Sequence, residues 1–430
     1  MQLILEDYPA VVGPNYETEA VCLECLRRVD GSILCHHCNL PLCSETCRDG
    51  PLHRPECEAF RRREKKIKIA EYGRGTVAYE YGCIAVLRLL WNRDNRPDQW
   101  ERLKYLMDHD EERRKEVDYW KMFQRNVVQF IRKGLGLQDM YSEEEINRAI
   151  GILRTNAFQI EHPYLQYQGT SGKAVYPTFS FMSHNCYNNG RYIVHPDNRL
   201  TLRAQREIKE GEEITIQYIS FLFGNFKRCP DIKACWFFQC SCRRCEDPTE
   251  LGTFLSAVLC QQCDGPVLPA DSSLTCLSWT CLHCGLTVDR EQVSSMVREL
   301  EDEMYKTEEQ EYDKYCQLVE RFSSLLHPHH YQLLLCKKYL AGSIRGNISL
   351  DMLEVKMLLW IMIVTIILLQ RKVELMTEFV EVFQVVDPGL TKWRGKMLYQ
   401  VHKTKMFLAD LKHSNDMMDS KTFRRGKEQY

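Results

Sequence analysis

The chain has 430 residues, of which 44% are hydrophobic, and its 57 basic and 59 acidic residues give a formal net charge of -2. This length indicates about three domains, and the apolar content is enough to build their cores. The balanced charge argues against a protein that wraps nucleic acid by bulk electrostatics alone, while local basic patches remain compatible with it.

The N-terminal region predicts the end of a β-strand followed by a turn, and we expect no secretory signal there. The stretch MQLILEDYPAVV lacks a basic start, and Glu6 and Asp7 interrupt its apolar run. Pro9, Gly13 and Pro14 predict the turn.

Eight cysteine and histidine residues follow in four closely spaced pairs. The pairs are Cys22 and Cys25, Cys35 and Cys38, Cys43 and Cys47, and His53 and Cys57. Thiolate and imidazole are ligands of structural zinc, and a gap of two or three residues lets one turn place two ligands on one ion. A disulfide framework, the alternative, needs an oxidising compartment that the N-terminal sequence does not indicate. We therefore predict two closed zinc sites in the nucleus or the cytoplasm.

Residues 60–156 are strongly charged and predict several amphipathic helices. The basic cluster at residues 61–68 is typical of a solvated helix face. Contact with a nucleic-acid backbone is the weaker alternative for this cluster. Residues 172–218 instead favour a small, irregular β-domain, because RYIVHP (191–196) and LTLRAQ (200–205) alternate like strands and GEEITIQY (211–218) follows a turn.

Cysteines return between residues 229 and 284. Cys260, Cys263, Cys281 and Cys284 have the spacing of a four-cysteine zinc ribbon. A second group supplies three ligands, one fewer than a tetrahedral zinc ion needs, in Cys240, Cys242 and Cys245. The cysteines left over are interpreted as core or incidental thiols, and they are Cys83, Cys229, Cys235, Cys276, Cys316 and Cys336.

Only helical patterns follow from residue 291 to the end. Residues 357–369 form an uncharged run that is shorter than the roughly 20 residues a membrane span requires. We therefore expect no membrane association and predict a helix buried inside an all-helical domain.

Several segments carry a family resemblance. YPTFSFMSHNCYNN (176–189), GEEITIQY (211–218) and FQCSCRRC (238–245) resemble the SET domain and post-SET segment of protein lysine methyltransferases. The four ligand pairs at residues 22–57 resemble the MYND zinc finger, and DPGLTKWRGKMLYQVH (387–402) looks like a tetratricopeptide-like helical domain. In this order, the segments resemble the SET-and-MYND (SMYD) family over nearly the whole chain, most strongly its arthropod-specific SMYD-A branch.

The resemblance implies an α+β fold class. A small β-rich SET core is split by the finger and a helical insert, and an all-α domain ends the chain. The implied segments are a residual N-terminal SET segment (1–20), the MYND finger (21–58), the helical insert (59–170), the SET core (171–228), the post-SET segment with the zinc ribbon (229–290) and the helical C-terminal domain (291–430).

The family's activity would be S-adenosylmethionine-dependent methylation of lysine in histones or other proteins, with a role in transcriptional regulation. This reaction needs a neutral amine, and an aromatic channel can both desolvate the lysine and attract the sulfonium cation. Tyr218 would be the catalytic residue. Asn156, Ser183 and His184 would contact the cofactor, His184 largely through its backbone, and Trp236 and Phe238 would line the pocket.

The resemblance also assigns the metal ligands. One ion of the finger would bind Cys22, Cys25, Cys43 and Cys47, and the other would bind Cys35, Cys38, His53 and Cys57. Cys186 would complete the post-SET site of Cys240, Cys242 and Cys245. That ion would fasten the post-SET segment over the active site, which couples folding of the pocket to metal binding.

Two departures from the family pattern predict weak cofactor binding. The motif Asn-His-Ser-Cys reads Ser183-His184-Asn185-Cys186 here, and the lost amide costs about 1–3 kcal/mol if its partner stays buried and unpaired. Relatives also carry a glycine-rich strand and turn upstream of LILEDYPAVVGP, and this chain starts after it. The second hypothesis is therefore a catalytically weak or silent adaptor or corepressor whose finger recruits proline-rich peptides. Either protein would be a monomer.

Overall fold

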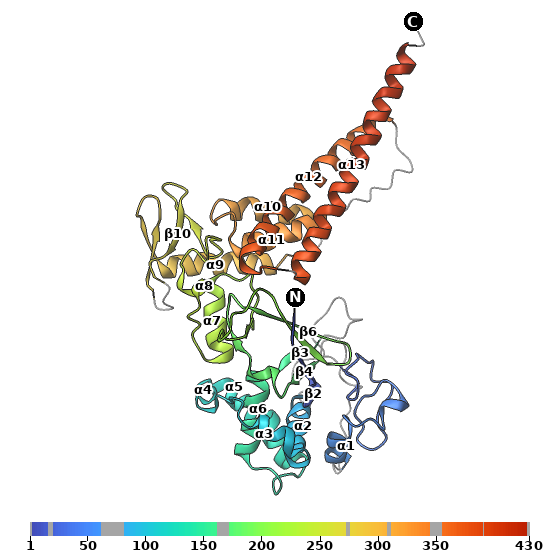
Figure 1. Cartoon of the computed structure of the whole chain (residues 1–430), viewed down its shortest axis with the longest axis vertical. Helices are drawn as coiled ribbons and strands as arrows, with labels where there is room; N and C mark the ends of the chain where they lie inside the picture. The colour runs from blue at the N-terminus through green and yellow to red at the C-terminus, as the bar shows by residue number, and fades with distance from the viewer. Residues whose placement is uncertain are drawn as a thin grey trace. The chain divides into compact units, whose positions relative to one another are not determined.

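The computed structural model describes residues 2–15, 20–61, 81–160, 172–271, 276–307, 311–344, 355–389 and 391–427. The chain divides into two compact units (Figure 1). The first consists of Met1–Ser183, Asn189–Ile216 and Cys235–Phe237, and the second of His184–Asn188, Gln217–Ala234 and Phe238–Tyr430. The division runs through the segment predicted as the SET core, and each unit is described by itself.

Two antiparallel three-stranded sheets form the β-structure of the first unit. One has the order β1 (Leu3–Asp7), β7 (Leu200–Ala204) and β6 (Gly190–Val194), and the other has the order β2 (Val11–Pro14), β4 (Gly172–Val175) and β3 (Phe158–Ile160). Leu202 on the central strand β7 faces both Leu5 and Tyr192 across the ladder. The strands predicted within residues 191–196 and 200–205 are thereby confirmed as β6 and β7. Strands β1 and β2 both pair with segments far away in the sequence, which holds residues 3–14 against the β-core.

Helices occupy most of the described residues between 54 and 156, in agreement with the helices predicted for residues 60–156. They are α1 (Arg54–Arg61), α2 (Gly82–Asn95), α3 (Pro97–Leu103), α4 (Asp110–Lys115), α5 (Val117–Phe123), the π-helices η4 (Gln124–Val128) and η5 (Phe130–Gly134), and α6 (Glu143–Asn156). Of the basic cluster at 61–68, all but Arg61 lies outside the described residues.

Helix α6 has a sequence-encoded start and positions Asn156 at its end. Ser142 accepts a hydrogen bond from the backbone of Glu145, and the Glu145 side chain accepts one from the backbone of Ser142. This reciprocal cap satisfies two backbone donors that the first turn leaves open. The helix ends because Ala157 is extended (ψ 139°), and β3 begins one residue later.

The second unit joins a small zinc-ribbon sheet to a helical region. The antiparallel sheet has the order β12 (Thr287–Asp289), β11 (Ser278–Cys281), β10 (Pro266–Pro269) and β9 (Val258–Leu259). Its helices are α7 (Asn225–Trp236), whose last two residues group with the first unit, α8 (Arg243–Glu246), α9 (Arg290–Tyr305), α10 (Tyr312–Ser323), α11 (Tyr331–Ser343), α12 (Val355–Val386) and α13 (Lys392–Lys427). Trp279 of β11 is 1% exposed in a core shared by the sheet and these helices. Short elements elsewhere in the chain are η1 (Glu45–Cys47), η6 (Phe179–Phe181), β5 (Ser183–His184) and β8 (Thr215–Ile216).

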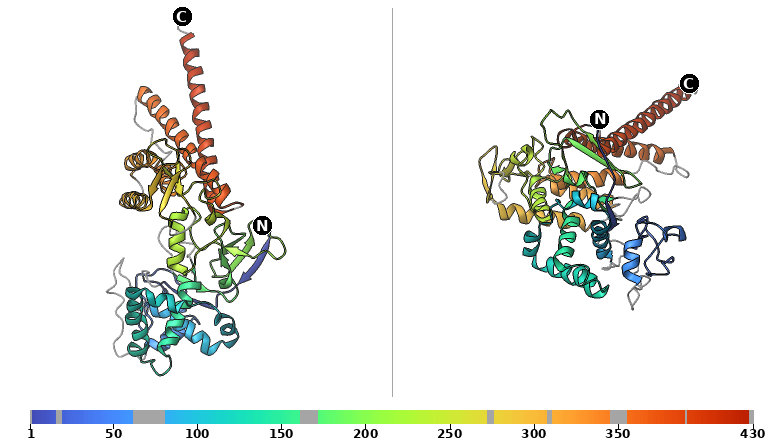
Figure 2. Two further views of the ribbon diagram at one scale, coloured as in Figure 1. Left: turned by 90° about the vertical axis from the view of Figure 1, so that its left-hand side faces the viewer. Right: turned by 60° about the horizontal axis from the view of Figure 1, so that its bottom comes forward.

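The long helices α12 and α13 lie side by side as an antiparallel pair in both views (Figures 1 and 2). The prediction that the apolar run at 357–369 is buried on all sides is wrong for its described side chains. Leu369 is 4% exposed, whereas Ile363 and Ile367 are 46% and 57% exposed. The reason is that neighbouring helices cover only part of the circumference of α12. No helix in the described part of the chain combines the length and apolarity that a bilayer span requires.

Candidate functional site

Sixteen cysteine and histidine side chains come together in four groups, in each of which the ligand atoms lie within 4.8 Å of one another. The groups are Cys22, Cys25, Cys43 and Cys47; Cys35, Cys38, His53 and Cys57; Cys186, Cys240, Cys242 and Cys245; and Cys260, Cys263, Cys281 and Cys284. These are the four sets that the sequence and its resemblance predict. Thiolate and imidazole groups at this separation fit a tetrahedral zinc ion, so the residues can hold four ions.

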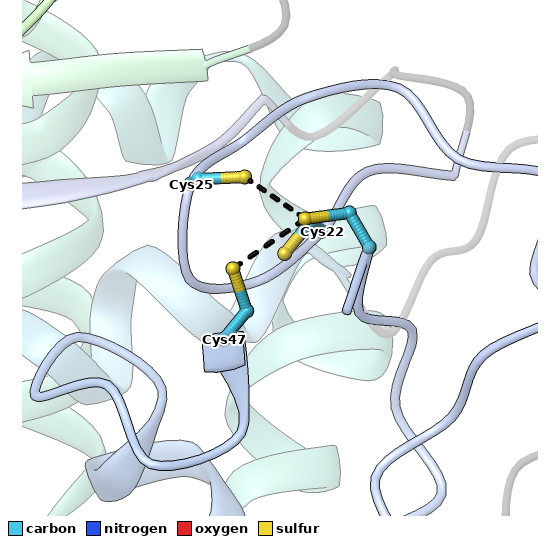
Figure 3. Close-up of side chains that lie close together, drawn as sticks. Cys22, Cys25 and Cys47 are labelled. Carbon is cyan, nitrogen blue, oxygen red and sulfur yellow. Dashed lines mark hydrogen bonds between the residues drawn. The ribbon is translucent and has the colours of Figure 1, made fainter. Parts of the chain in front are cut away.

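The first module is cross-braced, because each of its ion sites takes two pairs that alternate along the chain. Figure 3 shows Cys22, Cys25 and Cys47 directing their sulfur atoms toward one another. Cys43 Sγ lies 3.4 Å from Cys47 Sγ and 3.5 Å from Cys25 Sγ. These separations are far longer than the roughly 2.05 Å of a disulfide, and all the cysteines are free thiols, so the geometry favours metal over disulfides.

Four of the ligand pairs share one turn geometry. In each, the residue four positions after the first cysteine has a positive φ: Leu26 (57°), Asn39 (64°), Asp264 (56°) and Gly285 (74°). Each donates its backbone N–H to the carbonyl of that first cysteine at 2.8–3.1 Å. This left-handed position closes the loop so that both sulfur atoms of the pair face the same point, and only Gly285 adopts it without a side-chain penalty.

A buried relay of charged side chains, from His53 through Glu56 to Arg88, supports the one histidine among the sixteen ligand residues. His53 Nδ1 lies 3.5 Å from Glu56 Oε1, and Glu56 in turn binds the guanidinium of Arg88 on α2. Arg88 also donates to the Val12 carbonyl at 2.6 Å and is 4% exposed. A carboxylate behind a metal-binding imidazole fixes its orientation and strengthens it as a ligand. Sequence inspection missed this relay, although the spacing of His53 and Glu56, one helical turn apart, could have indicated it.

The third group brings Cys186 from the SHNC segment to the cysteines after α7. Cys186 Sγ lies 3.4 Å from Cys245 Sγ and 3.9 Å from Cys240 Sγ, and Cys186 is completely buried. One finding was not anticipated: Cys229 Sγ lies 3.7 Å from Cys245 Sγ, so this thiol borders the cluster.

Three residues of the predicted methyl-transfer site meet in the second unit. The ring of His184 lies 5.2 Å from that of Tyr218 and 6.0 Å from that of Phe238, measured between centroids. The Tyr218 backbone N–H donates to His184 Nδ1 at 3.0 Å, and His184 Nε2 lies 3.1 Å from Cys186 Sγ. Burial lowers the pKa of His184 to about 4, which keeps the ring neutral at physiological pH. The result is a half-buried aromatic group beside the cysteine cluster.

The other predicted cofactor residues belong to the first unit. The Asn156 side chain donates to the carbonyls of Met107 and Ile152 at 2.8 and 2.9 Å, which uses both of its donors and leaves its oxygen as the group available to a ligand. The Ser183 residue is exposed to solvent, and Trp236 is half-buried. Asn185, the asparagine that has exchanged places with the serine of the motif, accepts a hydrogen bond from the Tyr187 backbone N–H at 2.8 Å and so stabilises a local turn.

The four ligand clusters define a protein organised by structural zinc sites. A model of the SET domain matches residues 31–219. The SET domain-containing protein SmydA-8, isoform A, of Drosophila melanogaster is 29% identical over 291 residues, covering 66% of this chain and 60% of that protein. The mouse (Mus musculus) histone-lysine N-methyltransferase Smyd1 is 26% identical, covering 58% of this chain and 52% of that protein. The zebrafish (Danio rerio) N-lysine methyltransferase SMYD2-B is 23% identical, with corresponding values of 53% and 51%.

The chain therefore contains a segment that matches the SET domain, and over half or more of its length it is similar to SET-domain proteins of the SMYD family. It spans between about half and three fifths of the length of the three relatives.

Proposed function

We propose that the protein is an S-adenosylmethionine-dependent protein-lysine N-methyltransferase. The observation that carries this proposal is the group of His184, Tyr218 and Phe238, in which a tyrosine predicted to be catalytic packs beside a neutral histidine and an aromatic wall. The relatives named as lysine methyltransferases support the same reaction. S-adenosylmethionine, when bound, supplies an electrophilic methyl group on a sulfonium.

The residues of this chain would then act on the lysine amine. A free lysine amine with a pKa near 10.4 is almost entirely protonated at neutral pH, and an apolar aromatic surrounding favours its neutral form. The Tyr218 hydroxyl would orient the amine toward the methyl group, which makes alignment the main source of rate acceleration. Asn156, Ser183 and Trp236 are the further residues that we expect to contact the cofactor.

Methylation of purified protein lysines by the purified chain tests the proposal. The chain is incubated with the methyl donor and a panel of histones and lysine-containing peptides, and mass spectrometry detects added methyl groups. Tyr218→Phe should reduce turnover by about 10²–10⁴-fold with unchanged zinc content, because it removes one hydroxyl and little packing. Methylation that is equally fast in Tyr218→Phe would refute this role of Tyr218.

The second candidate is an adaptor that recruits proline-rich peptides through the MYND finger at residues 21–58. Ser183 in place of the usual asparagine favours it, because one hydroxyl cannot replace a carboxamide as donor and acceptor. Rescue of cells that lack the protein separates the two functions. If Tyr218→Phe rescues and Cys35→Ser fails, the protein works as an adaptor, and the reverse pattern supports the enzyme.

The location and assembly of the protein are part of the same proposal. Thiol clusters of this density persist in a reducing compartment, which supports the nucleus and the cytoplasm. We propose a monomer that acts on histones or other protein lysines, with only weak contact to nucleic acid because the net charge is near zero. A transcriptional role would follow from histone substrates.

A further inference from the structure

A fully buried arginine lies directly behind the sulfur atoms of the post-SET cluster. Arg228 on α7 has a side-chain exposure of 0%. Its Nε lies 3.0 Å from Cys186 Sγ, and its Nη2 lies 3.7 Å from Cys245 Sγ. The remaining donors of the guanidinium bind the Phe223 carbonyl, the Asn225 side chain and Glu250 Oε2. Each nitrogen of the guanidinium therefore has at least one acceptor, and two of these acceptors are sulfur atoms of the ligand cluster.

Glu250 and a second buried arginine hold this guanidinium in place. Arg244, also 0% exposed, lies 3.0 Å from Glu250 Oε2 and donates to the carbonyls of Phe221 and Phe223. The other Glu250 oxygen accepts from the Asn225 backbone and from the Ser256 hydroxyl at 2.8 and 2.7 Å. Arg244 contacts no ligand sulfur in the hydrogen bonds of the described residues. Arg244 therefore holds Glu250 in place, and of the two arginines only Arg228 contacts the ligand sulfur atoms.

The charges of this buried group require the cluster to be negative. Two guanidinium groups and one carboxylate leave one positive charge in excess, and an unpaired buried charge is strongly unfavourable. Four thiolates around a divalent zinc ion carry two negative charges in excess. The loaded cluster therefore supplies the negative charge that the group at Arg228 needs, whereas four neutral thiols would leave the positive charge without a counterion.

We infer that Arg228 is an outer-shell positioning residue of the post-SET metal site, which retains the ion by donating N–H···S hydrogen bonds to Cys186 and Cys245. The fork geometry is essential, because a lysine ammonium on a flexible stem cannot reach both sulfur atoms and the Glu250 carboxylate in the same fixed arrangement. This inference is independent of methyl transfer, since it concerns how the chain holds a structural ion.

Release of zinc from the full chain tests the inference. The wild type and Arg228→Lys are loaded with zinc, and release to a chromogenic chelator is followed. We expect one of the four ions to leave about 10–100-fold faster in Arg228→Lys, the range usual for outer-shell partners of metal ligands. Cys229→Ser is the matched control, because it alters a neighbour of Cys245 and leaves the Arg228 guanidinium in place, and it should leave the release rates unchanged. Equal release from the wild type and Arg228→Lys would overturn the inference, and so would an equal acceleration in Cys229→Ser.

A second measurement needs no variant and covers the case in which Arg228→Lys fails to fold. The wild-type chain is loaded with cadmium-113, and scalar coupling between the Arg228 Nε proton and the ion is sought by nuclear magnetic resonance. Coupling through the sulfur atom of Cys186 is the expected result, because it requires a real N–H···S hydrogen bond. A resolved Arg228 Nε proton without coupling to any cadmium ion would contradict the proposed contact.

Discussion

The backbone N–H of Tyr218 donates to Nδ1 of His184 at 3.0 Å, and this contact decides where the imidazole carries its proton. Because Nδ1 must accept, the neutral ring holds its proton on Nε2, which lies 3.1 Å from Cys186 Sγ. The ring therefore connects the tyrosine backbone to a metal ligand. The predicted contact of His184 with the cofactor through its backbone leaves the side chain available for this bridge.

Substitution of His184 should loosen the Tyr218 backbone. His184→Leu removes the acceptor and should speed amide hydrogen exchange at Tyr218 while costing about 1–3 kcal/mol, since a buried donor loses its partner. His184→Asn is the control, because its side-chain oxygen can still accept from the Tyr218 N–H. Exchange measured by mass spectrometry on a peptide spanning Tyr218 distinguishes the two variants, and equal protection in both would disprove the bridge.

Metal analysis of the purified chain should give four zinc ions per molecule. The reason is that four groups of four ligand atoms each lie within 4.8 Å, and closed tetrahedra of thiolate and imidazole bind zinc tightly. A strong chelator should unfold the finger and ribbon, because their folding energy comes from the metal. A stoichiometry of two or fewer in well-folded protein would contradict the post-SET and ribbon sites together.

Glu56→Gln should weaken zinc binding at the His53 site. The neutral amide is a poorer partner for His53 and leaves the buried Arg88 charge uncompensated, so we expect about 10–100-fold lower affinity and about 3–5 kcal/mol of lost stability. Glu58→Gln is the matched control on the same helix, because Glu58 is exposed. Competition with a zinc indicator measures the affinity, and the relay would be refuted if both variants behaved alike.

The second unit should lose stability in acid through His330. Burial lowers the pKa of His330 to about 3, against about 6.5 in the unfolded chain. Below pH 6.5 the His330 side chain is protonated in the unfolded state but stays neutral in the folded state. The free energy of unfolding therefore falls as the pH drops from 6.5 toward 3, by about 2 kcal/mol at pH 5.

His330→Asn isolates this contribution. His330 caps α11 by accepting from the Gln332 backbone N–H, and an asparagine oxygen can do the same without titrating. Thermal unfolding of both proteins at pH 7 and pH 5 provides the measurement. Any release of zinc in acid affects the two proteins equally, so it cancels when their decreases in Tm are compared. We expect the variant to show the smaller decrease in Tm, and an equal decrease would exclude His330 as the group responsible.

Local sequence patterns determined the ligand pairs, the helices of residues 81–156 and the strands β6 and β7. A Cys-x2-Cys turn, a capping box such as that of Ser142 and Glu145, and an alternating strand are all specified within about ten residues. Their structure therefore follows from neighbours along the chain. The pairing of distant ligand pairs came from family resemblance, because spacing alone leaves several combinations open.

Tertiary structure alone decided what surrounds these elements. Cys186 meets Cys245, Arg228 loses all contact with water behind them, and Ile367 remains exposed in a run that reads as core. Sequence reports the type of a side chain, whereas burial and charge compensation depend on which distant segments cover it. An arginine that reads as a surface residue thus becomes a buried partner of thiolates, because folding alone brings the charges together.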